Sequence, residues 1–501
     1  MILTNFRAIT LHSNEGSNAE TMRDRIKQLE QIASALEPNE AVRQTFTTSV
    51  LKYSEDFLRN ISELPAFRVS DTKGIGLYDS PIQDDPIGMD EILRLLKDNV
   101  DTPGLNPASG GHLGYIPGGG IYHGALGDFL AAVTNRYAGV FFASPGAVRM
   151  ENMLLDWMGA IIGYPKTAGG NLTSGGSLGN LIGIVTARDE FDIKGKDLER
   201  SVIYLSKQAH HSNDKAIRIA GLRECIVRYI PLDAGYRMKS SELDKAILAD
   251  RKAGLNPWLI IASAGTTDVG AVDPLSDIGA IAQKHGLWFH LDAAYGGFFA
   301  LCDSGRQVLK GMETSDSVVM DPHKGLFVPY GSGAVLVKDK TKLLASHYYQ
   351  ANYMQDALNS TDELSPADLS PELSKHFKGL RLWLPLKLVG VKPFRAMLEE
   401  KIQLARYFYE SIQAVKGIEV GPVPELSVVA FRYVPESGDA DEFNKRLVGE
   451  IQGDGRVFLS STVLDGKFTL RLAALSFRTH LATIDEALKI LKEKIAVVSN
   501  G

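Results

Sequence analysis

Short apolar runs alternate with helical stretches between about Thr102 and Leu384, and this alternation restricts the fold more than any other feature of the chain. The runs are rich in β-branched residues and have the length of buried strands, whereas the stretches between them have apolar residues at helical spacing. This order predicts a mostly parallel sheet that is covered by helices on both faces. The predicted strands are SVIYL (201–205), IVRYI (226–230), WLIIA (258–262), LWFHL (287–291), SVVM (317–320) and GAVLV (333–337).

Segments with a different pattern flank this central part. The first hundred residues contain two stretches with helical spacing and then a loop rich in Gly, Pro and Asp. After about Pro385 the pattern predicts a long helix, strand-like pieces and a C-terminal helix. We therefore expect three parts: an N-terminal helical segment that packs on a partner subunit (1–101), a large domain (102–384) and a small α+β domain (385–501).

The composition of the 501 residues is globular and argues against several classes of protein. Net charge is −6, and no cluster of Lys and Arg with aromatic residues indicates a nucleic-acid surface. No apolar run reaches the length of a membrane span or of a signal-peptide core. Cys225 and Cys302 are too few for a disulfide framework and are not spaced like metal ligands. We expect a cytoplasmic protein without a metal that acts on a small molecule.

Two charged residues follow neighbouring predicted strands. Asp292 lies in FHLDAAYGG, and Lys324 lies 32 residues later in DPHKGLF. Ligands of parallel sheets bind at the carboxyl ends of the strands, so we expect both side chains at one site. An isolated Asp is usually a turn residue and an isolated Lys is usually solvated, but Lys324 precedes an apolar stretch where an unpaired ammonium would be costly. An acid for the pyridine nitrogen and a lysine for the aldehyde carbon are the residue types that hold pyridoxal 5′-phosphate.

Three further motifs suit the same cofactor. The Gly- and Ser-rich turn in LTSGGSLGN (172–180) precedes a helix, and free N–H groups at a helix start bind phosphate. His210 follows the strand 201–205 and could lie on the pyridine ring or meet a substrate carboxylate. Thr266 and Thr267 follow the strand 258–262 and could bind the cofactor through a hydroxyl. Each motif alone is more simply explained as a helix cap, a loop histidine or a capped turn.

From about residue 75 to its end, the chain resembles the pyridoxal-phosphate-dependent group II decarboxylases, the family of aromatic-L-amino-acid, histidine and glutamate decarboxylases. SGGS, QAH, DAAYGG and DPHKG carry the resemblance, because they occur together in the family's order. It implies an α/β fold like that of aspartate aminotransferase (the type I fold of these enzymes), with a mostly parallel seven-stranded sheet. It also implies a homodimer with sites at the subunit interface. The implied reaction is decarboxylation of an L-amino acid, an aromatic one, to the amine and CO₂.

The resemblance assigns roles to individual residues. Lys324 is implied as the Schiff-base lysine, Asp292 as the acid on the pyridine nitrogen and His210 as the ring-stacking residue, and these three are the implied catalytic residues. The implied cofactor-binding residues are Gly176, Ser177, His210, Thr267, Asp292, Ala294, Ser317, Asp321, His323 and Lys324. The implied substrate-binding residues are Tyr115, Ile116, Pro117, Gly118 and His210.

Three positions depart from the family pattern. Gly325 follows the lysine where animal aromatic decarboxylases commonly have Trp, and His211 follows the stacking histidine where a small residue is frequent. Asp321 stands where Asn is common. Because phosphate repels a carboxylate, we expect the Asp321 side chain to turn away or to pair with another group.

The sequence also suggests a lid and leaves three alternatives to decarboxylation. The region 346–374 suits a flexible lid, and Tyr348, Tyr349 and Tyr353 are candidates for a proton-donating tyrosine. Loss of that tyrosine would favour oxygen-dependent formation of an aldehyde. A carbon–carbon lyase would use the same electron sink for retro-aldol cleavage. A non-enzymatic cofactor-binding protein would have to keep Lys324 and His210 for structure alone.

Overall fold

The computed structural model of the chain describes residues 21–349 and 363–500. Tyr353 lies outside the described residues, whereas Tyr348 and Tyr349 lie within them. No helix in the described ranges combines the length and the apolar character that crossing a bilayer requires.

A seven-stranded sheet forms the centre of the large domain, in the order β3-β9-β8-β7-β6-β4-β5. All neighbouring strands from β8 to β5 pair in parallel, and β9 is antiparallel to both of its neighbours. The predicted mostly parallel seven-stranded sheet is confirmed. The strands are β3 (Gly169–Thr173), β4 (Ser201–Ser206), β5 (Ile226–Ile230), β6 (Asn256–Ser263), β7 (Trp288–Asp292), β8 (Ser317–Met320) and β9 (Gly333–Val337).

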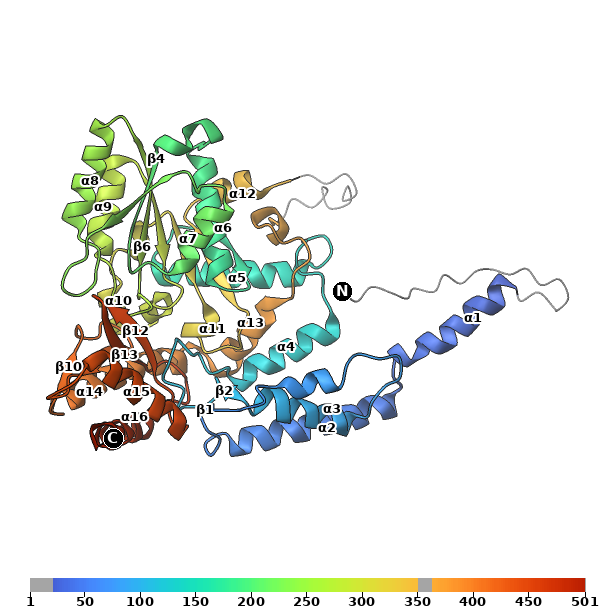
Figure 1. Cartoon of the computed structure of the whole chain (residues 1–501). Coiled ribbons are helices and arrows are strands. Elements are labelled where there is room, and N and C mark those ends of the chain that lie inside the picture. The colour runs from blue at the N-terminus through green and yellow to red at the C-terminus, as the bar shows by residue number, and fades with distance from the viewer. Residues whose placement is uncertain (1–20, 350–362, 501) are drawn as a thin grey trace, which may run out of the picture.

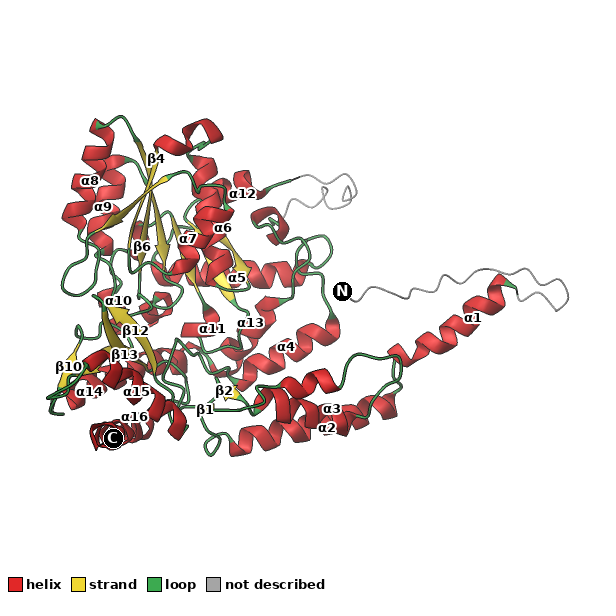
Figure 2. Ribbon diagram, viewed as in Figure 1, coloured by secondary structure: helices red, strands yellow, loops and turns green. Residues whose placement is uncertain are grey.

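Both faces of this sheet are buried under helices, as Figures 1 and 2 show. On β4, Val202 and Tyr204 point into one apolar cluster, and Ile203 and Leu205 point into another. This alternation follows from the two-residue period of a strand. Helices α5 (Pro145–Ile162), α8 (Ser240–Lys252) and α9 (Leu275–His285) contribute to the first cluster, and α6 (Gly176–Glu190), α7 (His211–Ile219) and α12 (Lys340–His347) to the second.

Four more helices belong to the described part of the large domain. Helices α4 (Tyr122–Thr134) and α13 (Lys378–Val389) pack on each other, and α10 (Asp303–Val308) follows β7. The one-turn helix α11 (Pro322–Gly325) follows β8 directly and carries the lysine of the DPHKG motif. The expected boundary after residue 384 falls inside α13, and the division into domains stays a proposal.

The C-terminal part is an antiparallel sheet with three helices, drawn in orange and red in Figure 1. It has its own apolar core, which includes Phe408, Phe431 and Leu491. This α+β architecture agrees with the sequence. Its elements are α14 (Val391–Gln413), β10 (Ile418–Val420), β11 (Val428–Tyr433), α15 (Ala440–Asp454), β12 (Ser460–Leu464), β13 (Lys467–Ala473) and α16 (Leu481–Asn500).

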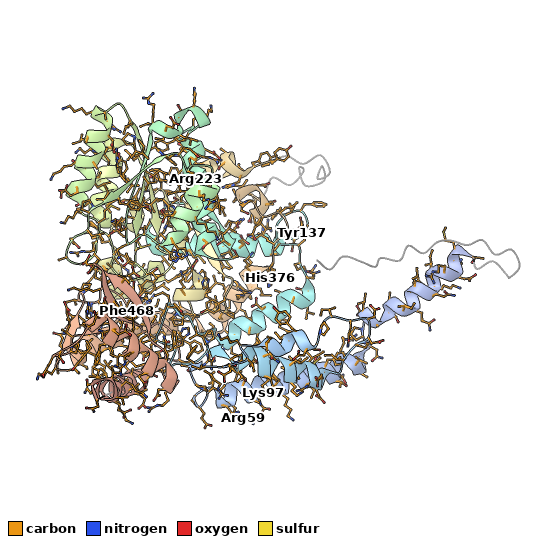
Figure 3. The ribbon with its side chains drawn as sticks, in the orientation of Figure 1. Arg59, Lys97, Tyr137, Arg223, His376 and Phe468 are labelled. Atoms are coloured by element: carbon orange, nitrogen blue, oxygen red, sulfur yellow. The ribbon has the colours of Figure 1, made fainter. Side chains whose placement is uncertain are left out.

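Residues 21–101, here called the N-terminal arm, form helices that the rest of the described chain hardly covers. Neither α1 (Met22–Ala33) nor α2 (Glu40–Asn60) buries a single residue, and α1 projects away from the molecule in Figure 1. Figure 3 shows Arg59 and Lys97 on this arm, below the main body. Helix α3 (Met89–Leu96) packs on α2, and β1 (Phe67–Arg68) pairs with β2 (Gly104–Leu105).

Candidate active site

The carboxyl ends of the parallel strands open into a cavity of about 660 Å³. His210 follows β4, Thr267 follows β6, Asp292 ends β7, and Asp321 follows β8. Ligands of open α/β sheets bind at this edge because the loops from several strands meet there. Asp292 and Lys324, 32 residues apart in the sequence, therefore lie at one site.

Most of the residues implied by the resemblance line this cavity. They are Tyr115, Ile116, Gly176, Ser177, His210, Thr267, Asp292, Ala294, Asp321, His323 and Lys324.

Three of the implied residues lie behind the cavity wall, and these expectations need correction. Ser317 opens β8, at the end of the strand remote from the cavity, and its hydroxyl is occupied by other side chains. Pro117 and Gly118 are buried; a Cβ on Gly118 would lie 2.1 Å from the carbonyl oxygen of His323. Gly118 thus packs directly against the backbone of α11.

Two amide side chains hold the Asp292 carboxylate. Asn180 on α6 donates a hydrogen bond to Oδ2 of Asp292 at 2.9 Å, and Asn213 on α7 donates to the same oxygen at 2.8 Å. Asp292 is 7% exposed. Hydrogen bonds from two donors fix the orientation of a carboxylate. Asp292 is therefore suited to hold a proton on a ligand atom in the cavity.

A buried chain of hydrogen bonds sets the orientation of Asn180. The Trp288 indole donates to Ser317 at 2.8 Å, and Ser317 lies 2.7 Å from Nδ1 of His290. Nε2 of His290 lies 3.0 Å from the amide oxygen of Asn180. Burial lowers the pKa of His290 to about 4, so the ring is neutral at pH 7. If Nε2 of His290 carries the proton, it donates to the amide oxygen of Asn180. The N–H groups of Asn180 then point toward Asp292, in agreement with the hydrogen bond between them.

His210 caps α7 and presents one ring nitrogen to the cavity side. Its Nδ1 accepts a hydrogen bond from the backbone N–H of Ser212 at 3.2 Å, so in the neutral ring Nε2 carries the proton. Burial lowers the pKa of His210, which keeps the ring neutral at pH 7. The neighbouring ring of His211 lies 4.0 Å away, centroid to centroid, and His211 is exposed. Nε2–H of His210 is a donor suited to a carboxylate.

Lys324 meets Asp321 across one turn of α11. Its Nζ lies 3.0 Å from Oδ2 of Asp321, so the expectation that Asp321 would find another partner holds. His323 lies between them in sequence, and its Nδ1 is 2.6 Å from the Ser332 carbonyl, to which it donates. Burial lowers the pKa of His323, so this ring is neutral as well.

The start of α6 has the geometry of an anion cradle. Gly175 and Gly176 precede Ser177 at the helix start, and in the described residues no acceptor pairs with the N–H groups of Gly176 and Ser177. A Cβ on Gly176 would lie 3.0 Å from both Ala294 Cβ and Asp321 Oδ2, so only glycine leaves space there. Free helical N–H groups bind phosphate.

Together these groups fit pyridoxal 5′-phosphate, with an amine, a fixed carboxylate, a neutral imidazole and a phosphate cradle around one cavity. The donor set does not resemble a metal site. In residues 21–349 and 363–500, no group of three or more His, Cys, Asp or Glu side chains is arranged to hold a metal ion.

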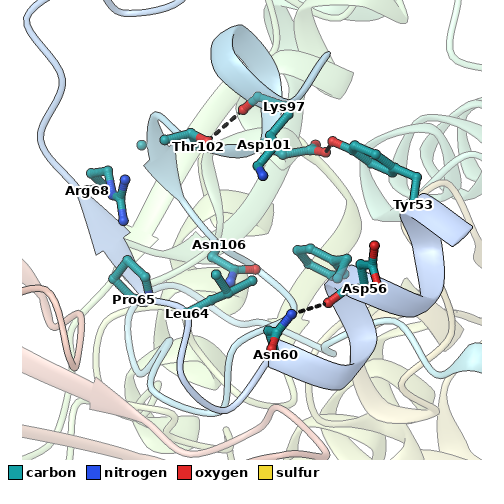
Figure 4. Close-up of a pocket in the computed structure, with 12 residues that line it drawn as sticks. Tyr53, Asp56, Asn60, Leu64, Pro65, Arg68, Lys97, Asp101, Thr102 and Asn106 are labelled. Carbon is teal, nitrogen blue, oxygen red and sulfur yellow. Dashed lines mark hydrogen bonds between the residues drawn. The ribbon is translucent and has the colours of Figure 1, made fainter. Parts of the chain in front are cut away.

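A smaller cavity of about 290 Å³ lies between the N-terminal arm and residues 102–106 (Figure 4). Tyr53 on α2 donates a hydrogen bond to Asp101 at its edge, and Phe57, Leu64 and Pro65 contribute apolar atoms. It contains none of the residues that the sequence assigns to the site. We place the active site at the sheet edge because the reactive groups converge there.

Comparison with known proteins gives the family. Residues 77–434 match the model of the pyridoxal-dependent decarboxylase conserved domain. An aromatic-L-amino-acid decarboxylase from Bacillus atrophaeus is 34% identical over 406 residues, which are 80% of this chain and 84% of the relative. A phenylacetaldehyde synthase from Petunia hybrida is 31% identical over 497 residues, 93% of this chain and 96% of the relative. The chain belongs to the pyridoxal-dependent decarboxylase family.

A solved structure agrees with this result. Oryza sativa TDC with PLP and tryptamine superposes with a TM-score of 0.87 at 25% identity, over 92% of this chain and 99% of that one. The predicted fold and cofactor are thus confirmed, and the protein is a pyridoxal-phosphate-dependent carboxy-lyase.

Sequence reasoning missed the residues that support the site from behind. Asn180, Asn213 and His290 were not singled out, although each is polar and completely or almost completely buried. His290 stands inside the apolar strand LWFHLD, and a buried polar side chain requires a partner. A polar residue inside an apolar strand could thus have indicated that a hydrogen-bond network exists, but not which residues form it.

Proposed function

We propose that this protein decarboxylates aromatic L-amino acids to the corresponding amines and CO₂. The observation that carries the proposal is the convergence of the Lys324 amine, the Asp292 carboxylate and the α6 start on one cavity. The aromatic preference is supported by the names of the Bacillus relative and of the rice structure with tryptamine. The side chains of Tyr115, Ile116 and Tyr330 add an apolar wall for a ring.

Each part of the cofactor has a candidate partner in the cavity. Lys324 would bind the aldehyde carbon through its amine, and Asp292 would face the pyridine nitrogen. The N–H groups of Gly176 and Ser177 would hold the phosphate. His210 would lie against the ring, with Ala294 and Thr267 as further contacts. Bound there, pyridoxal phosphate supplies a ring that accepts the electron pair left on the α-carbon when CO₂ departs.

The side chains of the protein account for the rest of the reaction. Asp292, fixed by Asn180 and Asn213, would hold a proton at the pyridine nitrogen throughout. Nε2–H of His210 would donate to the substrate carboxylate and set the direction of the bond that breaks. Tyr115 and Ile116 would exclude water from that side of the cavity. Lys324, the only lysine among the described lining residues, would be available to move a proton at the α-carbon of the substrate.

A combined spectroscopic and product assay tests this proposal. The purified protein should show an absorption band of a cofactor–lysine linkage. Borohydride should abolish this band and leave the reduced cofactor attached to Lys324 as a covalent label. The variant Lys324→Ala should lack the label, whereas Lys310→Ala, which changes an exposed lysine, should retain it. Tyrosine, tryptophan, phenylalanine and dopa should release CO₂ and an amine with higher kcat/KM than glutamate or histidine. Labelling without CO₂ from any amino acid would contradict decarboxylation.

A second candidate is oxygen-dependent aldehyde formation, in which an amino acid, O₂ and water give an aldehyde, CO₂, ammonia and hydrogen peroxide. The name of the Petunia relative supports it. Detection of aldehyde and peroxide in equal amounts would identify this activity. Aldehyde without peroxide, together with a second amine, would instead indicate a carbon–carbon lyase.

We also propose that the protein is a homodimer that forms through the N-terminal arm and α4. Phe46 and Leu51 on α2, and Phe129 and Val133 on α4, each expose 43% or more of their surface. Exposed apolar surface of this extent is typical of an interface, and helices that bury nothing gain stability only by packing. A second copy is the natural occupant because a two-fold axis lets one patch cover itself.

Sedimentation velocity measures this oligomeric state. The wild type should sediment at twice the chain mass, and Phe129→Asp should shift it to the monomer. Glu410→Ala, which removes a surface side chain outside the patch, is the control. A monomeric wild type with full activity would contradict the proposal. We further propose a cytoplasmic location, because both cysteines are buried free thiols, as is usual in reducing compartments.

A further inference from the structure

Asp321 places a buried carboxylate beside the proposed phosphate cradle. The residue follows β8 and is 1% exposed. Its Oδ2 would lie 3.0 Å from a Cβ on Gly176, the first residue of α6, and lies 3.0 Å from Nζ of Lys324. The carboxylate therefore faces the same helix start whose N–H groups would receive the cofactor phosphate.

The second oxygen of this carboxylate has no partner. Oδ1 of Asp321 is buried and makes no hydrogen bond within the described residues. An ionised carboxylate can only accept hydrogen bonds, and so can a phosphate dianion. Two such anions side by side would repel each other. A protonated carboxyl, in contrast, would donate a hydrogen bond to a phosphate oxygen.

The other charges around the cavity offset little of the repulsion between the Asp321 carboxylate and a phosphate. Among the described lining residues, Lys324 is the only lysine or arginine, and Asp292 and Asp321 are both acidic. Burial lowers the pKa values of His210 and His323, so neither ring adds a positive charge at pH 7. The start of α6 contributes no titratable side chain. The titratable groups near Asp321 are Lys324, His323, His210, Asp292 and Tyr330.

We propose that Asp321 takes up a proton when the cofactor phosphate binds, and that the resulting neutral carboxyl donates a hydrogen bond to the phosphate. In this step one O–H bond forms on the carboxylate with a proton from solvent, and no other bond changes. Before binding, the carboxylate pairs with Lys324. The inference rests on the proposed position of the cofactor phosphate.

Proton uptake makes phosphate binding depend on pH in a defined direction. If the complex binds one proton more than the free protein, its affinity falls as pH rises, by up to about tenfold for each pH unit. Asp321→Asn keeps the shape of the side chain and supplies a donor that does not titrate. This variant should therefore lose the dependence and bind phosphate more tightly at high pH.

Pyridoxine 5′-phosphate is a suitable probe because it has the phosphate but no aldehyde, and so cannot bond to Lys324. Titration calorimetry from pH 7.0 to 8.5 covers a range above the second phosphate pKa of about 6. The wild type should lose about tenfold in affinity per pH unit relative to Asp321→Asn. Repetition in buffers of different ionisation enthalpy should give an uptake of about one proton for the wild type and about none for the variant.

Matched controls separate this role from other effects. Pyridoxine, which lacks the phosphate, should show the same pH dependence with both proteins. Asp277→Asn removes an exposed carboxylate on α9 and should retain the wild-type slope. Asp321→Ala, as a second variant, should be as independent of pH as Asp321→Asn. Equal slopes for wild type and both Asp321 variants would overturn the inference, whereas absence of binding in all proteins would overturn the proposed cofactor site as well.

Discussion

The buried chain of hydrogen bonds behind Asp292 should make the stability of the protein sensitive to acid through one residue, His290. The ring is fully buried, and burial lowers its pKa from about 6.5 to about 4. In the unfolded chain the histidine binds a proton below about pH 6.5, whereas the folded protein resists protonation down to about pH 4. Stability is therefore complete above the unfolded pKa and falls as pH decreases through this window.

The expected magnitude follows from the two pKa values. Between pH 7.5 and 5.0 the unfolded state takes up nearly a full proton at this position and the folded state takes up almost none. Linkage then gives a loss of about 2 kcal/mol in the free energy of unfolding. The variant His290→Gln lacks the titrating group and keeps a side chain that can donate to Asn180. Its stability should thus fall by about 2 kcal/mol less than that of the wild type over the same range.

Thermal unfolding of both proteins at fixed concentration, at pH 7.5 and 5.0, measures this difference. His112→Gln is a matched control, because burial also lowers the pKa of His112 to about 4 but His112 lies outside the chain that orients Asn180. Both variants should be less acid-sensitive than the wild type, and only His290→Gln should also weaken cofactor binding. An equal loss of stability in wild type and His290→Gln would refute the reasoning.

Three further variants test other parts of the structure. Asp292→Ala should reduce kcat by about 10²-fold or more, because a preorganised charge at the reacting group is lost, and activity assays with saturating cofactor would measure this. Lys375→Met leaves Glu151 buried without its ion pair, at 2.7 Å in the wild type, and should lower the free energy of unfolding by about 3–5 kcal/mol in urea titrations. Gly118→Ala should displace α11, since the added Cβ would meet the carbonyl of His323, and loss of bound cofactor absorbance would report it.

Local pattern in the sequence determined the elements of the large domain closely. The strands expected at 226–230, 317–320 and 333–337 and the helix expected at 275–285 have these bounds in the structure. Apolar periodicity suffices there because each element is buried and long enough to carry its own signal. The motifs around Asp292 and Lys324 likewise indicated the cofactor and the edge of the sheet. These motifs could be recognised because each consists of neighbouring residues at the end of one strand.

One strand of the seven-stranded sheet was not predicted from the sequence. The sequence of β3, GGNLT, is rich in glycine and has little intrinsic tendency to form a strand. It becomes one because it pairs with β9 along its whole length. A partner more than 150 residues away cannot be inferred from the segment itself.

Only the tertiary structure decided which of the site residues line the cavity and which hold the lining residues in place. Ser317 was expected at the cofactor, yet it belongs to the chain that orients Asn180, because the direction of a side chain depends on its place along the strand. Asp321 and Lys324 form a pair because one turn of α11 brings their side chains together. The sequence by itself determined which chemical groups the site contains, and packing between distant elements decided which of them meet.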